Sequence, residues 1–291
     1  MLVSTDWLAE HLSDPDLVVA DMRWRESGRG PELYRQGHIP GAVRLDWSTD
    51  LADPQSPVAF MLAPPDRFAR AMEERGIGDA TSLVAYSDQM GSGPYRLWWA
   101  CRVYGHDDVR VLDGGWDKWV AEGRPLSTDP PRPRPAGKWT ARPAVGLVAT
   151  AEDVVAATRE GGVAILDSRA PEQYRGDFVW FETGQVPAGP DGIARTGRGE
   201  CRAGHIPGAV NVPYASLYRN DLTMKGPDEL RALLADAGIG PGGKAITYCG
   251  CGISASALLF AITRAGVRDA ALYDASWEEW GRDPARPVAR G

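Results

Sequence analysis

The chain has 291 residues, of which 43% are hydrophobic, and it carries a formal net charge of −7 at neutral pH. This acidic balance lacks the basic footprint of nucleic-acid binding, and no apolar run approaches the ~18 residues that cross a bilayer. Four cysteines are too few for a disulfide framework, and the first residues lack the basic segment of a signal peptide, so we expect a reducing, cytoplasmic setting.

The expected elements, taken in chain order, alternate between strands and helices. Short apolar runs bounded by Gly, Asp or Pro predict strands at Val18–Met22, Ser82–Tyr86, Val109–Leu112, Val163–Asp167, Ala245–Tyr248 and Ala270–Tyr273. Helical patterns predict helices at Thr5–Leu12, Pro65–Arg75, Tyr95–Tyr104, Ala151–Glu160, Pro227–Ala237 and Ser254–Ala265. Thr150 is the expected N-cap of the helix that begins at Ala151. This alternation predicts an α/β fold with parallel sheets and flanking helices.

One pattern occurs twice in the chain. Tyr34–Asp46 (YRQGHIPGAVRLD) recurs as Cys201–Pro213 (CRAGHIPGAVNVP). A β-like run ending in an acidic residue and an arginine precedes each copy (VVADMR, AILDSR), and a Gly/Trp or Ser/Trp segment follows each (LDGGWDKW, LYDASWEEW). Similar pieces in the same order predict a duplicated domain. We expect domains at 1–122 and 144–291, joined by a proline-rich linker at 123–143.

The repeated HIPGA segment is typical of a turn, because proline fixes φ and glycine eases the bend. His38 and His205 occupy the same position in the two copies, although only the second half of the chain carries the cysteine loop described next. We therefore expect both histidines to serve in turn packing and hydrogen bonding.

The strongest chemical signal is Lys244–Ala257, KAITYCGCGISASA, where Cys249 follows a predicted strand and precedes a predicted helix. The backbone N–H groups and the helix dipole at such a loop stabilise a thiolate or a bound anion, so Cys249 is the predicted nucleophile. The alternative is a buried cysteine that only packs. We expect Gly250 and Gly252 to adopt positive φ angles, and Ser254 to cap the helix or to face the loop interior.

The two copies differ at this loop. Ser82–Trp99 aligns with Lys244–Phe260, but the first loop carries Ser87 and Asp88 where the second carries its cysteine. One half of the chain therefore holds the predicted nucleophile, and the other half serves as a scaffold.

Together, these motifs resemble the tandem-domain sulfurtransferases, the rhodaneses and 3-mercaptopyruvate sulfurtransferases, over nearly the whole chain. The resemblance implies two rhodanese-like domains, each with a mainly parallel central sheet, and a cysteine, Cys249, that carries sulfane sulfur as a persulfide. It implies a small-molecule donor, 3-mercaptopyruvate or thiosulfate, and a thiophilic acceptor such as cyanide, a thiol or thioredoxin. We expect no cofactor, and the C-x-C pair has too few further ligands nearby for a structural zinc site.

The loop sequence bears on the donor. In family members that favour thiosulfate, the positions after the cysteine are cationic, whereas mercaptopyruvate enzymes carry a neutral loop that resembles C-G-S-G-V-T. Here the loop reads CGCGIS, with Cys251, Ile253 and Ser254 in the places of the family's serine, valine and threonine. The resemblance therefore favours an organic donor such as 3-mercaptopyruvate.

Other positions depart from the family pattern. Gln173 stands where the resemblance places the first substrate arginine, and the following segment, Asp177–Ala203, is longer than usual. Arg175 and Arg198 are the predicted donor-binding residues. Further arginines of the same segment can supply the missing cation, namely Arg195 and Arg202.

The resemblance also assigns or removes other roles. It implies that Arg169, which follows Asp167 in the DxR motif, is structural. Phe60 stands at the family's histidine and Cys251 at its serine, so a serine–histidine–aspartate proton relay is not supported. Trp24 matches a position that packs near the substrate, with ordinary core packing as the alternative.

Rival functions remain open at this point. Cys251 either fills the place of serine or acts as a resolving thiol that attacks the Cys249 persulfide. The second reading predicts a dithiol oxidoreductase that uses both cysteines, and a further alternative is a sulfur-carrier or redox-sensing protein. A tyrosine-phosphatase-type enzyme is set aside, because Ala255 stands where it needs an arginine.

Overall fold

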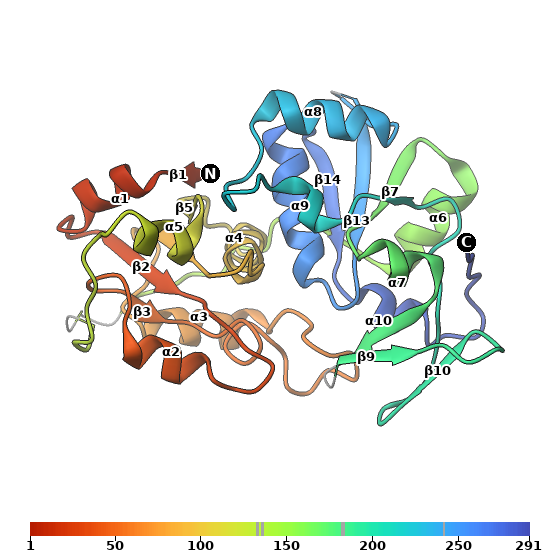
Figure 1. Ribbon diagram of the computed structural model, residues 1–291, viewed down its shortest axis with the longest axis horizontal. Coiled ribbons are helices and arrows are strands. Elements are labelled where there is room, and N and C mark those ends of the chain that lie inside the picture. The colour runs from red at the N-terminus through yellow and green to blue at the C-terminus, as the bar shows by residue number, and fades with distance from the viewer. Residues whose placement is uncertain (132–133, 135–136, 182–183, 241) are drawn as a thin grey trace. The chain divides into compact units, whose positions relative to one another are not determined.

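The protein is described by a computed structural model that covers residues 1–131, 134, 137–181, 184–240 and 242–291 (Figure 1). It divides into two compact units. Unit 1 comprises Met1–Gln55, Leu62–Val145 and Tyr218–Met224, and unit 2 comprises Ser56–Met61, Gly146–Leu217 and Lys225–Gly291. Each unit therefore takes one short segment from the half of the sequence that mainly builds the other.

Unit 1 contains a parallel five-stranded sheet with the order β1-β5-β4-β2-β3. The strands are β1 (Leu2–Val3), β2 (Leu17–Asp21), β3 (Val43–Arg44), β4 (Ser82–Tyr86) and β5 (Val109–Leu112). The helices are α1 (Thr5–His11), α2 (Gly30–Gln36), α3 (Pro65–Glu73), α4 (Gly93–Val103) and α5 (Gly115–Ala121).

Unit 2 repeats this topology with the order β6-β14-β13-β7-β12, again all parallel. The strands are β6 (Val148–Ala149), β7 (Val163–Asp167), β12 (Val210–Asn211), β13 (Lys244–Tyr248) and β14 (Asp269–Tyr273). The helices are α6 (Ala151–Glu160), α7 (Pro171–Arg175), α8 (Pro227–Asp236), α9 (Ile253–Arg264), α10 (Ser276–Trp280) and the 3₁₀ turn η1 (Tyr214–Leu217). The same strand order in both units is the three-dimensional counterpart of the sequence repeat, and the predicted fold class is confirmed.

The central strands explain why the sequence folds this way. All five residues of β2 and four of the five in β13 are buried, as expected for parallel strands that are covered on both faces. Helix α9 is equally apolar, and nine of its 12 residues are buried. It packs against β13 and β14, which places its N-terminus beside the loop that leaves β13 (Figure 1).

All six predicted strands and all six predicted helices exist, with ends that differ by no more than two residues. Thr150 caps α6 through a reciprocal pair of hydrogen bonds with Asp153. The predictions missed the short helices α2, α5, α7 and α10 and the two-residue strands, because so few residues do not display a period.

A larger omission lies in the segment 177–203, for which the sequence predicted no regular structure. The structure forms two antiparallel hairpins there, β8 (Phe178–Phe181) with β9 (Gly184–Pro187), and β10 (Ile193–Thr196) with β11 (Gly199–Arg202). Figure 1 shows them extending from the sheet of unit 2. The β10–β11 turn, Gly197-Arg198, lacks the Asn-Gly or Asp-Gly dipeptide that is the strongest short-range signal of a hairpin.

The two repeated histidines behave as expected. The His38 ring stacks on Tyr34 at a centroid distance of 4.0 Å, and its Nδ1 lies 2.9 Å from the Tyr34 carbonyl oxygen. The His205 ring stacks on Tyr174 at 3.7 Å, with its Nδ1 2.8 Å from the Tyr174 carbonyl oxygen. Both histidines therefore fasten the HIPGA turn to the preceding helix. Within the described residues, no helix is long and apolar enough to cross a membrane.

Candidate active site

Cys249 lies on the loop that joins β13 to α9 in unit 2. Strand β13 ends at Tyr248 and helix α9 begins at Ile253, so the loop stands at the carboxyl edge of a parallel sheet, where α/β proteins bind their ligands. Cys249 is a free thiol with only 2% of its surface exposed. The 12-residue helix α9 points its N-terminus, and thus the positive end of its dipole, at this loop.

A second segment, Ser276–Glu278 at the start of α10, holds the loop in place. The Cys249 N–H donates to Ser276 Oγ at 3.1 Å, and the Cys249 carbonyl accepts from the Trp277 N–H at 3.0 Å. The Glu278 N–H donates to the Gly250 carbonyl at 2.9 Å. Both backbone groups of the cysteine are therefore fixed by residues 27 and 28 positions further along the chain.

Ser276 is a functional residue that the sequence analysis missed. It is fully buried, and its φ of +52° is unusual for a residue other than glycine. Its hydroxyl donates to the Tyr273 carbonyl at 2.8 Å while it accepts the Cys249 N–H. Strained residues cluster at functional sites when the surroundings hold them. The segment LYDASWEEW marked this position only as part of a repeat, so the sequence carried no sign of the strain.

Several loop N–H groups remain open. Over the part of the chain that the structure describes, the N–H groups of Gly250, Gly252 and Ile253 donate no hydrogen bond to the protein. Gly252 has a φ of +78° and is the N-cap of α9, which confirms its prediction. The prediction for Gly250 was wrong, because its φ is not positive in the described backbone. Open N–H groups at a helix N-terminus form an anion cradle beside Cys249.

Ser254 does not cap the helix. It is the second residue of α9, and its Oγ lies 3.0 Å from Oγ of Ser168, which follows strand β7. Ser168 in turn donates its N–H to the Tyr248 carbonyl at 3.0 Å. Of the two expected roles, capping was therefore wrong, and the hydroxyl instead ties the start of α9 to the neighbouring strand.

Arg169 connects the segments that surround the cysteine loop. Its guanidinium donates to both carboxylate oxygens of the buried Asp167 at 2.6–3.0 Å and to the Gly204 carbonyl at 2.7 Å. It also stacks on the Trp277 ring at 4.5 Å. The guanidinium thus joins β7, the HIPGA turn and the segment that clamps Cys249, as expected for a structural arginine.

The comparison with known proteins decides the family. A model described as "Rhodanese-like domain" matches residues 4–122 and 150–283. The chain belongs to the rhodanese family. Its predicted resemblance to the tandem-domain sulfurtransferases is therefore confirmed.

Relatives of this rhodanese cover its whole length. The chain is 36% identical to "Sulfur carrier protein TtuD" of Thermus thermophilus, over 100% of this chain and 97% of the relative. It is 33% identical to "3-mercaptopyruvate sulfurtransferase" of Escherichia coli, over 98% and 96%. The crystal structure of SseA from Escherichia coli, a 3-mercaptopyruvate sulfotransferase in its description, superposes with a TM-score of 0.80 at 32% identity, covering 95% of this chain and 98% of that one.

Two of the predicted donor-binding residues of this rhodanese, Arg175 and Trp24, belong to different units. Arg175 is exposed and pairs with Asp177 at 3.0 Å and with Glu172 at 3.6 Å. Trp24 belongs to unit 1, where its Nε1 donates to Ser48 Oγ at 3.1 Å and its ring lies 4.8 Å from that of Trp47. The roles of Arg175 and Trp24 in binding a donor stay predictions.

Among the arginines of segment 177–203, Arg198 is linked to the cysteine loop through Glu278. Its Nη1 lies 3.5 Å from Oε1 of Glu278, the residue whose N–H holds the Gly250 carbonyl. Arg195 is exposed and pairs with Asp191 and Glu200. Arg202 instead donates to four backbone carbonyls, those of Trp280, Gly281, Asp283 and Arg286. The structure therefore makes Arg202 a structural residue and leaves Arg198 beside the site.

A small cavity adjoins the loop. Its volume of about 10 Å³ suits roughly one water molecule, and Gly250 and Glu278 line it together with Arg169, Gln173, Val179, Trp180, Cys201 and Trp277. Burial raises the pKa of the Cys201 thiol to about 11, which disfavours its thiolate at neutral pH.

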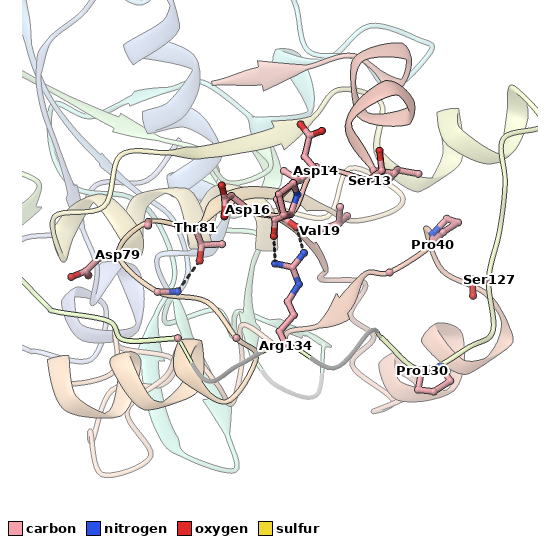
Figure 2. Close-up of a pocket in the computed structure, with 18 of the residues that line it drawn as sticks. Ser13, Asp14, Asp16, Val19, Pro40, Asp79, Thr81, Ser127, Pro130 and Arg134 are labelled. Atoms are coloured by element: carbon pink, nitrogen blue, oxygen red, sulfur yellow. Dashed lines mark hydrogen bonds between the residues drawn. The ribbon is translucent and has the colours of Figure 1, made fainter.

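A much larger cavity lies in unit 1. It has a volume of about 970 Å³ and opens at the amino ends of β2 and β4 in unit 1, the edge opposite to the one that carries the loops (Figure 2). Figure 2 shows Arg134 directed at the chain before β2, where it donates to the carbonyls of Pro15 and Leu17. No cysteine lines this cavity, so we place the chemistry at the smaller site. Among the described residues, no three His, Cys, Asp or Glu side chains are grouped to hold a metal ion.

Proposed function

We propose that the protein is a sulfurtransferase in which Cys249 takes sulfane sulfur from a small-molecule donor and passes it to a thiophilic acceptor. The observation that carries the proposal is the free Cys249 thiol within a loop of open N–H groups at the N-terminus of α9. In this proposal the region 144–291 is catalytic, and the region 1–122 with its linker at 123–143 is a scaffold.

The proposed reaction has two displacement steps. The Cys249 thiolate attacks the transferable sulfur of the donor and forms the S–S bond of a persulfide. The bond that breaks is the S–S bond of thiosulfate or the C–S bond of 3-mercaptopyruvate. Thiosulfate then leaves as sulfite, and 3-mercaptopyruvate leaves as pyruvate after protonation of its carbon. In the second step, cyanide or an acceptor thiolate attacks the outer sulfur, the persulfide bond breaks, and the Cys249 thiolate returns. The products are thiocyanate or an acceptor persulfide.

The loop supports the intermediate. A persulfide is anionic, and the open N–H groups of Gly250, Gly252 and Ile253 are suited to accept its charge without a competing side chain. Because these donors are fixed by the clamp of Ser276–Glu278, they require little reorganisation when the charge arrives.

The donor is inferred from the charges around the loop. The loop CGCGIS is neutral, which favours 3-mercaptopyruvate over thiosulfate. Arg198 is a cation of the long segment and contacts Glu278, whose N–H holds the loop. Arg198, with Arg175 and Trp24, completes the set of residues that we propose to support donor binding, either by direct contact or through a neighbouring side chain. Cyanide, small thiols and thioredoxin are the proposed acceptors, in a cytoplasmic setting.

A Cys249→Ser variant tests the proposal. We expect it to lose turnover with both donors, because a hydroxyl neither ionises at neutral pH nor forms a persulfide. Intact mass after donor treatment should show one added sulfur on the wild type and none on the variant. Ser87→Ala, at the matching position of unit 1, is the control and should keep wild-type turnover. Activity in the Cys249→Ser variant would refute the proposal.

A sulfur carrier is the second candidate function, favoured by the full-length similarity to a relative named sulfur carrier protein. A carrier and an enzyme both release sulfur to cyanide from a preformed persulfide. Steady-state kcat/KM values for 3-mercaptopyruvate and thiosulfate, measured side by side, separate them. Many turnovers with either donor indicate the enzyme, whereas a single stoichiometric release indicates the carrier.

A further inference from the structure

The two units use one position in opposite ways. Asp117 in LDGGWDKW and Glu278 in LYDASWEEW each follow the tryptophan of the repeat. In unit 1, the Asp117 carboxylate turns to its own loop and accepts the Gln89 N–H at 2.7 Å. In unit 2, the Glu278 carboxylate instead pairs with Arg198 at 3.5 Å and with Arg282 at 3.1 Å. A carboxylate therefore accepts an N–H of the first loop, whereas the matching carboxylate forms ion pairs with two arginines beside the second loop.

Glu278 lies close to the open N–H groups. Its own N–H donates to the Gly250 carbonyl at 2.9 Å, and the two residues line the same small cavity. The residue is only 7% exposed, and a buried carboxylate requires opposite charge or hydrogen-bond donors. The loop N–H groups would satisfy that requirement, as the N–H of Gln89 does for Asp117.

Arg198 is anchored so that it can hold this carboxylate. It stands in the turn of the β10–β11 hairpin, and its Nη2 donates to the Pro57 carbonyl at 2.9 Å. Arg282 Nη1 donates to the Arg198 carbonyl at 2.9 Å, which connects the two cations. Arg282 is four residues after Glu278, so their ion pair is local in the sequence. Arg198 belongs to a separate hairpin, so its ion pair with Glu278 joins two distant segments.

We propose that Arg198 keeps the anion cradle of Cys249 open by holding the Glu278 carboxylate away from it. Glu278 is then an internal anion that competes with the donor and the persulfide for the loop N–H groups. Arg198 is a positioning residue in this scheme, because it acts through Glu278. The inference rests on the proposed function of the loop, and it gives the long segment 177–203 a purpose, namely to deliver this cation.

A direct contact between Arg198 and the donor makes a different prediction. If Arg198 binds the donor, Arg198→Met raises KM for an anionic donor whether or not Glu278 is charged. If Arg198 acts through Glu278, loss of the carboxylate charge reverses the defect. The two outcomes separate in a double-mutant cycle.

The cycle compares the wild type, Arg198→Met, Glu278→Gln and the double variant. The readouts are kcat/KM for 3-mercaptopyruvate and thiosulfate, and the rates at which iodoacetate and neutral iodoacetamide alkylate Cys249. We expect Arg198→Met to lower kcat/KM about ten-fold or more, because the Glu278 carboxylate then competes with the anionic donor for charge-assisted hydrogen bonds from the loop. The same variant should slow alkylation by iodoacetate more than alkylation by iodoacetamide. The double variant should return to within about three-fold of Glu278→Gln. Arg198→Lys, which keeps the charge, should retain most of the activity.

Two controls keep the result interpretable. Arg195→Met removes an exposed arginine of the same hairpin that pairs with Asp191 and Glu200, and it should leave all rates unchanged. Thermal unfolding identifies any variant that fails to fold, and Arg198→Lys then carries the test. A double variant as slow as Arg198→Met, or an Arg198→Met variant with wild-type rates, overturns the inference. A wild type that gains no sulfur in intact-mass analysis overturns the proposed function instead, and the alkylation rates still test the inference because they need no sulfur transfer.

Discussion

The loop after β4 in unit 1 and the loop after β13 in unit 2 occupy the same place in two sheets of the same strand order. In the first loop, Asp117 accepts the Gln89 N–H, the Gly91 N–H donates to the Asp88 carbonyl, and Arg25 neutralises the Asp88 carboxylate at 2.6 Å. In the second loop, the N–H groups of Gly250, Gly252 and Ile253 donate no hydrogen bond within the described residues. The same scaffold therefore places a carboxylate on one loop N–H in unit 1 and leaves three N–H groups of the loop open in unit 2.

The segments that hold the two loops in place, around Trp116 in unit 1 and Trp277 in unit 2, make matching hydrogen bonds. The Trp116 N–H donates to the Ser87 carbonyl at 2.9 Å, as the Trp277 N–H does to the Cys249 carbonyl at 3.0 Å. The residue before the tryptophan has a positive φ in both units, +55° for Gly115 and +52° for Ser276. Unit 1 uses glycine at this position, and a Cβ there would lie 2.3 Å from the Ser87 carbonyl oxygen. Unit 2 accepts the strain of a serine and gains a hydroxyl that binds the cysteine N–H.

The largest effect should come from removing that hydroxyl. Ser276→Ala leaves the buried Cys249 N–H without its partner and keeps the positive φ, so we expect it to lower the free energy of unfolding by about 1–3 kcal/mol. Ser276→Gly loses the same hydrogen bond but relieves the backbone strain, and should be less destabilising than alanine by about 1 kcal/mol. Denaturant unfolding measures both. If the Ser276→Ala variant is as stable as the wild type, the Ser276 hydroxyl does not offset the backbone strain and the prediction is wrong.

A smaller effect should separate the two glycines of the second loop. Gly252→Ala forces a left-handed φ of +78° on alanine and should cost about 1–2 kcal/mol of stability. Gly250→Ala places its Cβ where no atom lies within 4 Å, at a residue without a positive φ, and should change stability by less than about 0.5 kcal/mol. The comparison uses thermal or denaturant unfolding of both variants. Equal losses would show that φ is not what distinguishes the two positions.

The smallest effect on turnover should come from Cys251→Ser. If Cys251 only fills the place of the family's serine, the variant keeps most of its activity, because the loop is complete without a second thiol. If Cys251 resolves the persulfide, the lifetime of the added sulfur on Cys249 increases several-fold in the variant. Persulfide decay followed by intact mass decides between the two, and a several-fold longer lifetime would identify a dithiol enzyme.

Some of the site was readable from the sequence because its signals are local. The loop around Cys249 combines a short apolar run, glycines and an apolar helical pattern within 14 residues, and the structure has a strand, a loop and a helix there. The HIPGA turns were equally local, and the stacking of His205 on Tyr174 confirms their packing role. The repeat predicted a duplicated domain but not the strand order that both units share, since strand pairing joins segments that are distant in the sequence.

The predictions failed where a side chain chooses between partners that are far apart in the sequence. Ser254 was expected to cap its own helix or to face the loop interior; it does not cap the helix, and its hydroxyl contacts that of Ser168, which is 86 residues away. Gly250 and Gly252 look alike in the sequence, but only the one that begins α9 takes a positive φ. In both cases the local pattern allowed several conformations, and packing against a neighbouring strand or helix selected one.

The sequence by itself determined the α/β class, the duplication and the cysteine loop, because hydrophobic period, repeated motifs and turn residues are encoded within short segments. Only the tertiary structure decided which loop is open. Asp117 and Glu278 occupy the same position in the repeat. The Asp117 carboxylate accepts an N–H of its own loop, whereas the Glu278 carboxylate pairs with Arg198 of a hairpin and with Arg282, four residues further along the chain. A buried carboxylate goes to the donors within its reach, and those donors are set by the folded chain.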